Sequence, residues 1–215
     1  MISLTLQSSK SCVSAAIFQD SKILSFKKLR KKKKETTENL MKVLEKLHKD
    51  FPINKINQII LPRGPGSFTG IRSLISVAQG LALGCNAKIR TVSTFEAIIS
   101  SENFSEKKCL VIFKDSRDEY LFQFFKKKSN TILPKKEINS GDSREIKNHI
   151  EKVCLNEKIA IISDQNYRMF YNTFFKLHNL KVIEYDAKNV FFAHQRGFSS
   201  RSINPIYYFK HYAEW

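Results

Sequence analysis

Gly64-Pro65-Gly66-Ser67-Phe68-Thr69-Gly70 is the one dense cluster of glycine and proline in the sequence, and the elements on its two sides indicate an α/β fold. The apolar residues 57–61 before it are typical of a buried strand, and residues 71–83 after it carry apolar side chains at helical spacing. Glycine permits the tight backbone geometry of such a turn, and the N–H groups of the following helix can hold an anion there.

The loop matches neither of two common phosphate-binding patterns. A P-loop has Lys and then Ser or Thr after its last glycine, where this chain has Ile71-Arg72, and the dinucleotide pattern has a glycine where this chain has Thr69. Two interpretations stay open. The loop is either an anion-binding loop, or a structural turn in which Ser67 or Thr69 caps the helix and glycine lets another helix approach closely.

Patterns outside the loop predict two halves with a similar order of elements. In the first half they predict strands over residues 2–7, 12–18, 22–26, 57–61 and 88–92, and helices over residues 37–51, 71–83 and 94–99. In the second half they predict strands over residues 109–113, 119–125, 131–134, 159–163 and 181–184, and helices over residues 142–154 and 167–178. Residues 100–108 are polar enough for a linker, so we expect an N-terminal domain of residues 1–102 and a C-terminal domain of residues 103–215.

The chain is strongly basic. Its 215 residues carry a formal net charge of +17 and are 42% hydrophobic, which excludes a disordered or disulfide-scaffolded protein. The positive electrostatic field of such a chain attracts polyanions. One basic run is either a solvated loop or a surface that contacts the phosphates of a nucleic acid. Its members are Lys27, Lys28, Arg30, Lys31, Lys32, Lys33 and Lys34.

The cysteines and the apolar runs indicate in which cellular compartment the protein is expected. The four cysteines lack zinc-ligand spacing, so we expect small buried thiols in a reducing environment. No apolar run approaches the roughly 20 residues that cross a bilayer, and the start lacks the features of a signal peptide. We therefore expect a cytoplasmic protein that binds no membrane.

Three groups of residues resemble the TsaB (YeaZ) family: the glycine loop with Ile71-Arg72, the segment Gly80-Leu81-Ala82-Leu83-Gly84, and Ser93-Thr94-Phe95-Glu96-Ala97. Weaker support comes from Asp115-Ser116-Arg117 and from Pro205-Ile206-Tyr207. The resemblance implies an α/β fold of two ribonuclease-H-like domains, with mixed sheets flanked by helices, as in actin, hexokinase and Hsp70. It also implies a non-catalytic subunit that dimerises with TsaD. With the ATPase TsaE, the pair supports threonylcarbamoyl transfer to the adenosine 3′ of the anticodon in ANN-reading tRNAs.

Departures from the family pattern bear on catalysis. The family usually has Asp where this chain has Gln7, so a metal-bound phosphate would lose its carboxylate ligand. No histidine pair has the spacing of a helical metal site, and no base is identifiable for Ser67 or Thr69 as a nucleophile. We expect no catalytic residue, no metal and no tightly bound cofactor, with ATP or ADP possible only at the level of the complex. The tail also carries Phe209 where the family has Arg.

The resemblance implies that the helices at residues 37–51 and 70–83 pack against the equivalent helices of TsaD. The apolar surface of the second helix is wider than the stripe that packs against one sheet. An interface of this kind requires such additional apolar surface. Without TsaD, the same helices are expected to form a homodimer. For each predicted contact residue, a place in the domain's own core is the alternative. These residues are Leu40, Leu44, Leu47, Gly70, Leu74, Val77, Gly80 and Leu81.

Two other functions remain as alternatives. One is an independent ATPase or kinase of the actin-like fold, which would need an acidic residue at position 7. The other is a basic module that binds tRNA through residues 27–34, and this role can coexist with that of a scaffold.

Overall fold

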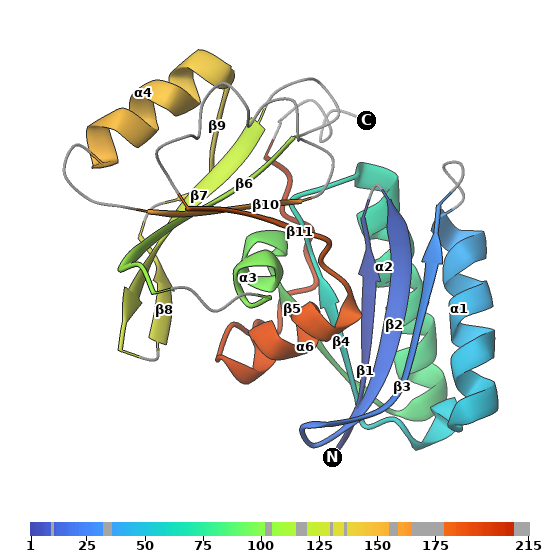
Figure 1. Cartoon of the computed structure of the whole chain (residues 1–215). Helices are drawn as coiled ribbons and strands as arrows, with labels where there is room; N and C mark the ends of the chain where they lie inside the picture. Colours follow the sequence, from blue (N-terminus) through green and yellow to red (C-terminus); the bar gives the residue numbers. More distant parts are fainter. Residues whose placement is uncertain are drawn as a thin grey trace. The chain divides into compact units, whose positions relative to one another are not determined.

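The computed structural model describes residues 1–9, 11–31, 36–101, 105–114, 120–129, 131–135, 137–154, 159–164 and 179–208. The chain forms two compact units, Met1–Ser100 with Tyr185–Trp215, and Ser101–Glu184 (Figure 1). The first boundary lies in the expected polar linker. The expected C-terminal domain of residues 103–215 is too long, because the chain returns to the first unit at Tyr185 and adds a helix to it.

The first unit contains a five-stranded mixed sheet in the order β3-β2-β1-β4-β5. Its strands are β1 (Ile2–Ser8), β2 (Cys12–Gln19), β3 (Lys22–Arg30), β4 (Gln58–Pro62) and β5 (Lys88–Val92). The first three strands pair antiparallel, whereas β1, β4 and β5 run parallel. Strands β1, β2 and β4 are buried on both faces, whereas the edge strands β3 and β5 are partly exposed.

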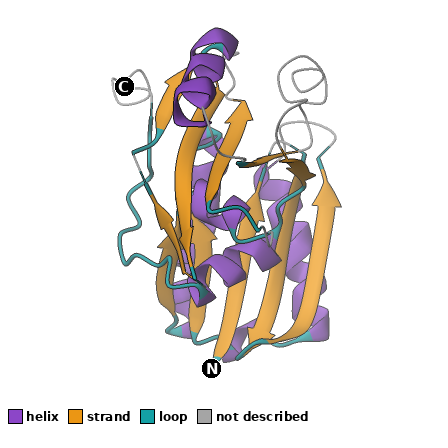
Figure 2. Cartoon of the chain, turned by 60° about the vertical axis from the view of Figure 1, so that its left-hand side comes forward, coloured by secondary structure: helices purple, strands orange, loops and turns teal. Residues whose placement is uncertain are grey.

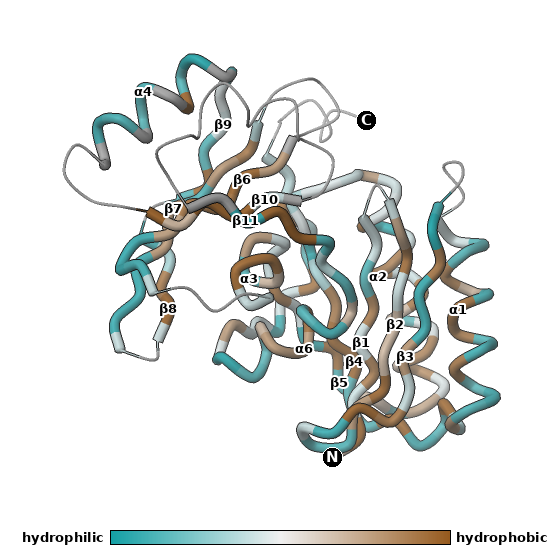
Figure 3. Tube along the Cα trace, in the orientation of Figure 1, coloured by the Kyte–Doolittle hydropathy of each residue, from teal (hydrophilic) through white to brown (hydrophobic). Residues whose placement is uncertain are grey.

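Helices cover both faces of this sheet (Figure 2). Helices α1 (Thr36–Asp50) and α2 (Phe68–Cys85) pack on one face, over a core that includes Leu6, Ile59 and Ala78. Figure 3 shows that the outer side of α1 is hydrophilic while the strands are largely apolar. A 3-10 turn, η1 (Ile53–Lys55), leads from α1 to β4. Helices α3 (Thr94–Ile99) and α6 (Ala187–Gln195) pack together, and Phe191 of α6 stacks on Phe18 of β2 with ring centroids 3.7 Å apart.

Helix α6 is an element that the apolar pattern alone does not predict. It begins with a capping box in which Asp186 accepts from the N–H of Lys188, at 2.8 Å, and Asn189 accepts from the N–H of Asp186, at 2.6 Å. The N–H of Ala187 donates to the hydroxyl of Ser14 on β2, at 2.9 Å. This contact joins the returning chain to the first sheet.

The second unit repeats the strand arrangement of the first. Strands β6 (Lys108–Lys114), β7 (Tyr120–Lys128) and β8 (Thr131–Pro134) pair antiparallel, and β6, β10 (Ala160–Asp164) and β11 (Asn179–Ile183) run parallel. A short strand, β9 (Asn139–Gly141), also pairs with β7, and α4 (Ser143–Cys154) follows it. The predicted helix over residues 167–178, the segment 115–117 and Phe209 lie outside the described residues.

Strand β3 and helix α2 are both longer than the sequence predicts. Strand β3 extends to Arg30, because pairing with β2 continues to Cys12, and the first part of the basic run is therefore strand rather than loop. Helix α2 begins at Phe68, where Ser67 caps it by accepting from the N–H of Gly70 at 3.3 Å. It continues past Gly84 to a C-cap at Asn86, which adopts a left-handed conformation with φ of 51°.

Candidate functional site

An apolar groove of about 430 Å³ lies between α1 and α2. Met41 of α1, which lines the groove, is 54% exposed, and Leu83 near the end of α2 is 86% exposed. Apolar side chains that gather on one exposed surface are a feature of protein–protein interaction sites. The groove is lined by Met41, Leu44, Glu45, His48, Ile53, Val77, Gly80 and Leu81.

Several predicted interface residues belong instead to the core of the first unit. Leu40, Leu47 and Leu74 are fully buried, and Leu44 is only 3% exposed. They lie in the stripe that each helix turns toward the sheet, so little of their surface can contact another chain, although Leu44 also lines the groove. Gly70 is buried as well, beside Ser67 and Ser8.

Val77, Gly80 and Leu81 lie on the groove side of α2, where a partner can reach them. Sequence reasoning missed Met41, His48, Ile53 and Leu83, although the over-wide apolar surface of α2 was a signal for Leu83. We call the apolar surface formed by the exposed Met41, Gly80 and Leu83 and by the half-buried Ile53, Val77 and Leu81 the α1–α2 face.

Several backbone groups at the ends of the glycine loop form hydrogen bonds within the first unit. The carbonyl of Gly64 accepts from the N–H of Thr94 at the start of α3, at 2.8 Å. The N–H of Arg63 donates to Val92 of β5, at 2.9 Å, and that of Ile71 to Ser67, at 2.9 Å. The loop thus joins β4, β5, α2 and α3, as a structural turn does.

A segment near the C-terminus, residues 198–208, crosses this loop, and we call it the C-terminal strap. Thr91 and Ser200 exchange two backbone hydrogen bonds of 2.9 Å, and the hydroxyl of Thr91 donates to the carbonyl of Ser202, at 2.6 Å. The N–H of Ile206 donates to the carbonyl of Arg63, at 2.8 Å. Gly64 has a φ of 107°, and a Cβ on it would lie 2.8 Å from the carbonyl oxygen of Ile206, so only glycine fits here.

Side chains from the strap and from α2 form one cluster. The guanidinium of Arg72 lies 3.8 Å from the ring centroid of Phe68 and donates from Nε to the hydroxyl of Tyr207, at 2.9 Å. The rings of Phe68 and Tyr207 lie 5.2 Å apart. Two sequence motifs that are distant in the chain, the glycine loop and Pro205-Ile206-Tyr207, therefore contact each other.

Gln7 at the end of β1 is fully buried. Its Oε1 accepts from the hydroxyl of Ser14, at 2.8 Å, and that hydroxyl in turn accepts from the N–H of Ala187. Its Nε2 has no hydrogen-bond partner among the described residues. A neutral amide that is held in this way supplies neither the charge nor the oxygen pair of a carboxylate metal ligand.

Two members of the basic run are engaged within the fold. The ammonium of Lys31 donates to Ser8, at 2.7 Å, and to Thr36, at 2.9 Å, and burial lowers the pKa of Lys31 to about 8. Lys27 pairs with Asp50, at 2.7 Å. The half-buried Lys31 therefore has hydrogen-bond partners within its own unit, while Lys32, Lys33 and Lys34 lie outside the described residues.

Among the described residues, no group of three or more His, Cys, Asp or Glu side chains is placed to hold a metal ion. In the same part of the chain, α2 is the one helix that has the length and hydropathy of a membrane span. A single such helix is weak evidence for a membrane, and Leu74 and Ala78 of α2 pack in the core of the first unit.

Two units that share this mixed strand order, with helices beside the sheets, define a protein of the actin, hexokinase and Hsp70 fold class. Comparison with solved structures agrees. YeaZ from Pseudomonas aeruginosa superposes with a TM-score of 0.72 and 17% identity, over 96% of this chain and 99% of that one. The ethanolamine utilization protein EutJ from Carboxydothermus hydrogenoformans gives a TM-score of 0.52 with 8% identity, over 90% of this chain and 89% of that one. These likenesses establish the predicted fold class.

Sequence comparison narrows the class to a family. The family model described as "TsaD: tRNA N6-adenosine threonylcarbamoyltransferase" matches residues 30–139. The tRNA threonylcarbamoyladenosine biosynthesis protein TsaB of Buchnera aphidicola from Acyrthosiphon pisum is 26% identical over 88% of this chain and 86% of its own length. The protein of the same name from Escherichia coli is 52% identical over 42 residues, 20% of this chain and 18% of that protein. The chain belongs to the TsaB (YeaZ) family.

Proposed function

We propose that this chain is a non-catalytic subunit that binds TsaD and supports the synthesis of threonylcarbamoyladenosine in tRNA. The observation that carries the proposal is the α1–α2 face, where Leu83 is 86% exposed and an apolar groove runs beside Met41. A surface of this kind is costly in water, and burial against a second apolar surface stabilises it.

The choice of TsaD follows from kinship between the two chains. The family model that is named for TsaD matches residues 30–139, which contain α1 and α2. A partner with related helices presents a similar apolar face, and two such faces can bury each other around a pseudo-twofold axis. For the same reason, a homodimer through this face is expected when TsaD is absent.

The proposal places catalysis in TsaD rather than in this chain. Gln7 supports this assignment, because its neutral amide stands at the end of β1 and is hydrogen bonded to Ser14. TsaE is the ATPase partner in the proposal, which assigns this chain no tightly bound cofactor of its own and allows ATP or ADP at the level of the complex. The site of action is the cytoplasm. Tight magnesium-dependent ATP binding by the isolated chain would revive the alternative of an independent ATPase or kinase.

Binding of the purified chain to TsaD tests the proposal. The variant Leu83→Glu places a charge in the α1–α2 face and should weaken the complex at least about tenfold. Leu133→Glu is the matched control, because Leu133 is a 52% exposed leucine on β8 of the other unit. If Leu133→Glu weakens the complex as much as Leu83→Glu does, the α1–α2 face is not the interface.

A further inference from the structure

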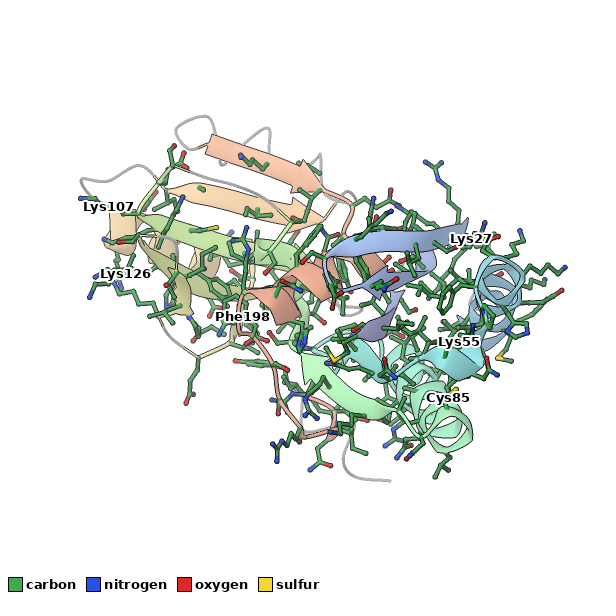
Figure 4. All side chains as sticks on the ribbon, turned by 90° about the horizontal axis from the view of Figure 1, so that it is seen from below. Lys27, Lys55, Cys85, Lys107, Lys126 and Phe198 are labelled. Atoms are coloured by element: carbon green, nitrogen blue, oxygen red, sulfur yellow. The ribbon has the colours of Figure 1, made fainter. Side chains whose placement is uncertain are left out.

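The C-terminal strap begins at Phe198, just beyond helix α6, and runs next to arginine residues (Figure 4). Its own arginine is Arg201, which is exposed. Because Thr91 of β5 and Ser200 of the strap pair antiparallel, the next residue of β5 on the side of Arg201 is Arg90. Two arginines therefore lie opposite each other in sequence position where the strap joins β5.

The strap meets two more arginines at intervals of three residues. Nη1 of Arg63 donates to the carbonyl of Asn204, at 3.4 Å, and Nε of Arg72 donates to the hydroxyl of Tyr207, at 2.9 Å. The six steps of chain from position 201 to position 207 span at most about 22 Å. The arginines thus form a row along the strap, and we call it the arginine row. It consists of Arg63, Arg72, Arg90 and Arg201.

The charges of the arginine row are available to a ligand. In the described part of the chain, none of its four members forms an ion pair with a carboxylate. Arg72 and Arg201 are exposed, and Arg63 and Arg90 are half-buried. Arginine is uncommon here, since it supplies nine of the 37 basic residues, yet four of those nine lie in the row. A guanidinium group presents five N–H donors in a fixed fork that suits phosphate oxygens, so the row suits a phosphate ligand.

We infer that the arginine row binds the phosphodiester backbone of RNA. A line of positive charges fits a linear polyanion, whereas one small phosphate reaches only part of the row. The exposed strap residues Ser202 and Asn204 carry hydroxyl and amide groups, which hydrogen bond phosphate and sugar oxygens. A lipid surface is bound instead by basic residues together with apolar anchors. The inference extends the proposed function and rests on it only for the choice of tRNA as the probe.

The end of the row at Arg72 predicts which form of RNA is bound. The guanidinium of Arg72 lies 3.8 Å from the ring centroid of the half-buried Phe68, and Arg72 itself is exposed. Unpaired bases of RNA stack on guanidinium planes and on aromatic rings. The row should therefore prefer an RNA with single-stranded loops, such as tRNA, to a fully paired RNA duplex.

The test measures binding of fluorescent tRNA to the full chain at several salt concentrations. The double variant Arg90→Gln/Arg201→Gln should lower the affinity at least about tenfold and reduce the slope of log affinity against log salt by about two. The control Lys46→Gln/Lys55→Gln removes the same charge at exposed lysines of α1 and η1, and should change the affinity less than about threefold. Figure 4 shows Lys55 well apart from Phe198, where the strap begins.

A third double variant separates the charge of the row from its effect on the fold. Arg90→Lys/Arg201→Lys keeps both positive charges, so it should retain the salt slope and lose less than about threefold in affinity. Thermal unfolding of all three double variants shows whether each is folded. If the lysine variant binds tRNA as weakly as the glutamine variant does, the two arginines act through the local structure rather than through phosphate contacts.

Other outcomes would also overturn the inference. Equal losses in the glutamine variant and in the Lys46→Gln/Lys55→Gln control would mean that net charge alone attracts tRNA. Binding to vesicles of phosphatidylserine without binding to tRNA would assign the row to a membrane. Tighter binding of duplex RNA than of tRNA would contradict the role of Arg72. TsaD is absent from every assay, so a failed interface proposal leaves these results unaffected.

Discussion

Tyr207 accepts a hydrogen bond from Nε of Arg72 at 2.9 Å, although 135 residues separate the two along the chain. The contact fixes the C-terminal strap to the first turns of α2, the helix that supplies much of the α1–α2 face. It gives a physical reason why the tail motif and the glycine loop occur in one protein. The strap is thus part of the structure that positions the proposed interface.

Replacement of Tyr207 by Phe removes the acceptor and keeps the ring beside Phe68. We expect the free energy of unfolding to fall by about 1 kcal/mol, because a hydrogen bond to a charged group is lost at an exposed site. Urea denaturation measures this change, and limited proteolysis reports release of the strap. Arg201→Ala, at an exposed arginine of the strap itself, is the control and should leave both readouts unchanged.

Two glycines of the first unit should respond in opposite ways to alanine. Gly64→Ala should destabilise the protein by more than about 2 kcal/mol, because the left-handed backbone is strained and the new Cβ meets the carbonyl of Ile206. Gly84→Ala should stabilise it by about 0.5 kcal/mol, because Gly84 is helical and no atom lies within 4 Å of the new Cβ. Thermal unfolding of both variants checks the pair. A neutral Gly64→Ala would show that the strap does not lie tightly on the loop.

Substitution of two leucines of α2 should have different effects, because one lies in the core and the other in the proposed interface. Leu74→Ala should cost about 2 to 5 kcal/mol of stability, because Leu74 is fully buried. Leu83→Ala should cost less than about 0.5 kcal/mol, because Leu83 is 86% exposed, and should weaken TsaD binding instead. Chemical denaturation and titration calorimetry measure the two effects. A Leu83→Ala variant that loses stability but keeps full affinity would place Leu83 in the fold rather than in the interface.

The pKa of Lys31 predicts a pH dependence of stability. Burial lowers this pKa from 10.5 to about 8 in the folded protein. Between pH 8 and pH 10.5 the unfolded chain binds more protons at Lys31 than the folded chain does. The free energy of unfolding therefore rises with pH over this range. Below about pH 8 both states are protonated and the cost of burying the ammonium is fully present.

The comparison is with Lys31→Gln, which removes the titrating group. The stability of the unmodified chain should rise relative to that of the variant as the pH increases from 8 toward 10.5, as measured by urea denaturation at each pH. Parallel curves for the two proteins would mean that Lys31 is better solvated than its contacts with Ser8 and Thr36 indicate.

Local patterns predicted most strands and helices of the first unit, because its periodic apolar segments are long and the glycine loop marks the start of α2. They did not predict α6, since nine residues with a modest apolar stripe leave a weak signal and its place depends on contacts with Ser14 and Phe18. The capping residues Asp186 and Asn189 were a signal that could have revealed it.

The site was only partly predictable for a related reason. Helical spacing identifies apolar residues but does not distinguish those that face the sheet from those that face solvent. Leu74 and Leu81 therefore looked equivalent in the sequence, although Leu74 is in the core and Leu81 lines the groove.

Reconstituted modification of tRNA tests the central claim most directly. The reaction contains this chain, TsaD and TsaE from the same organism, tRNA and threonylcarbamoyl-adenylate, with each protein omitted in turn, and modified adenosine is quantified. The account predicts that modification is lost without this chain, is restored by the unmodified protein and by Leu133→Glu, and is reduced with Leu83→Glu. Full modification in the absence of this chain would contradict it.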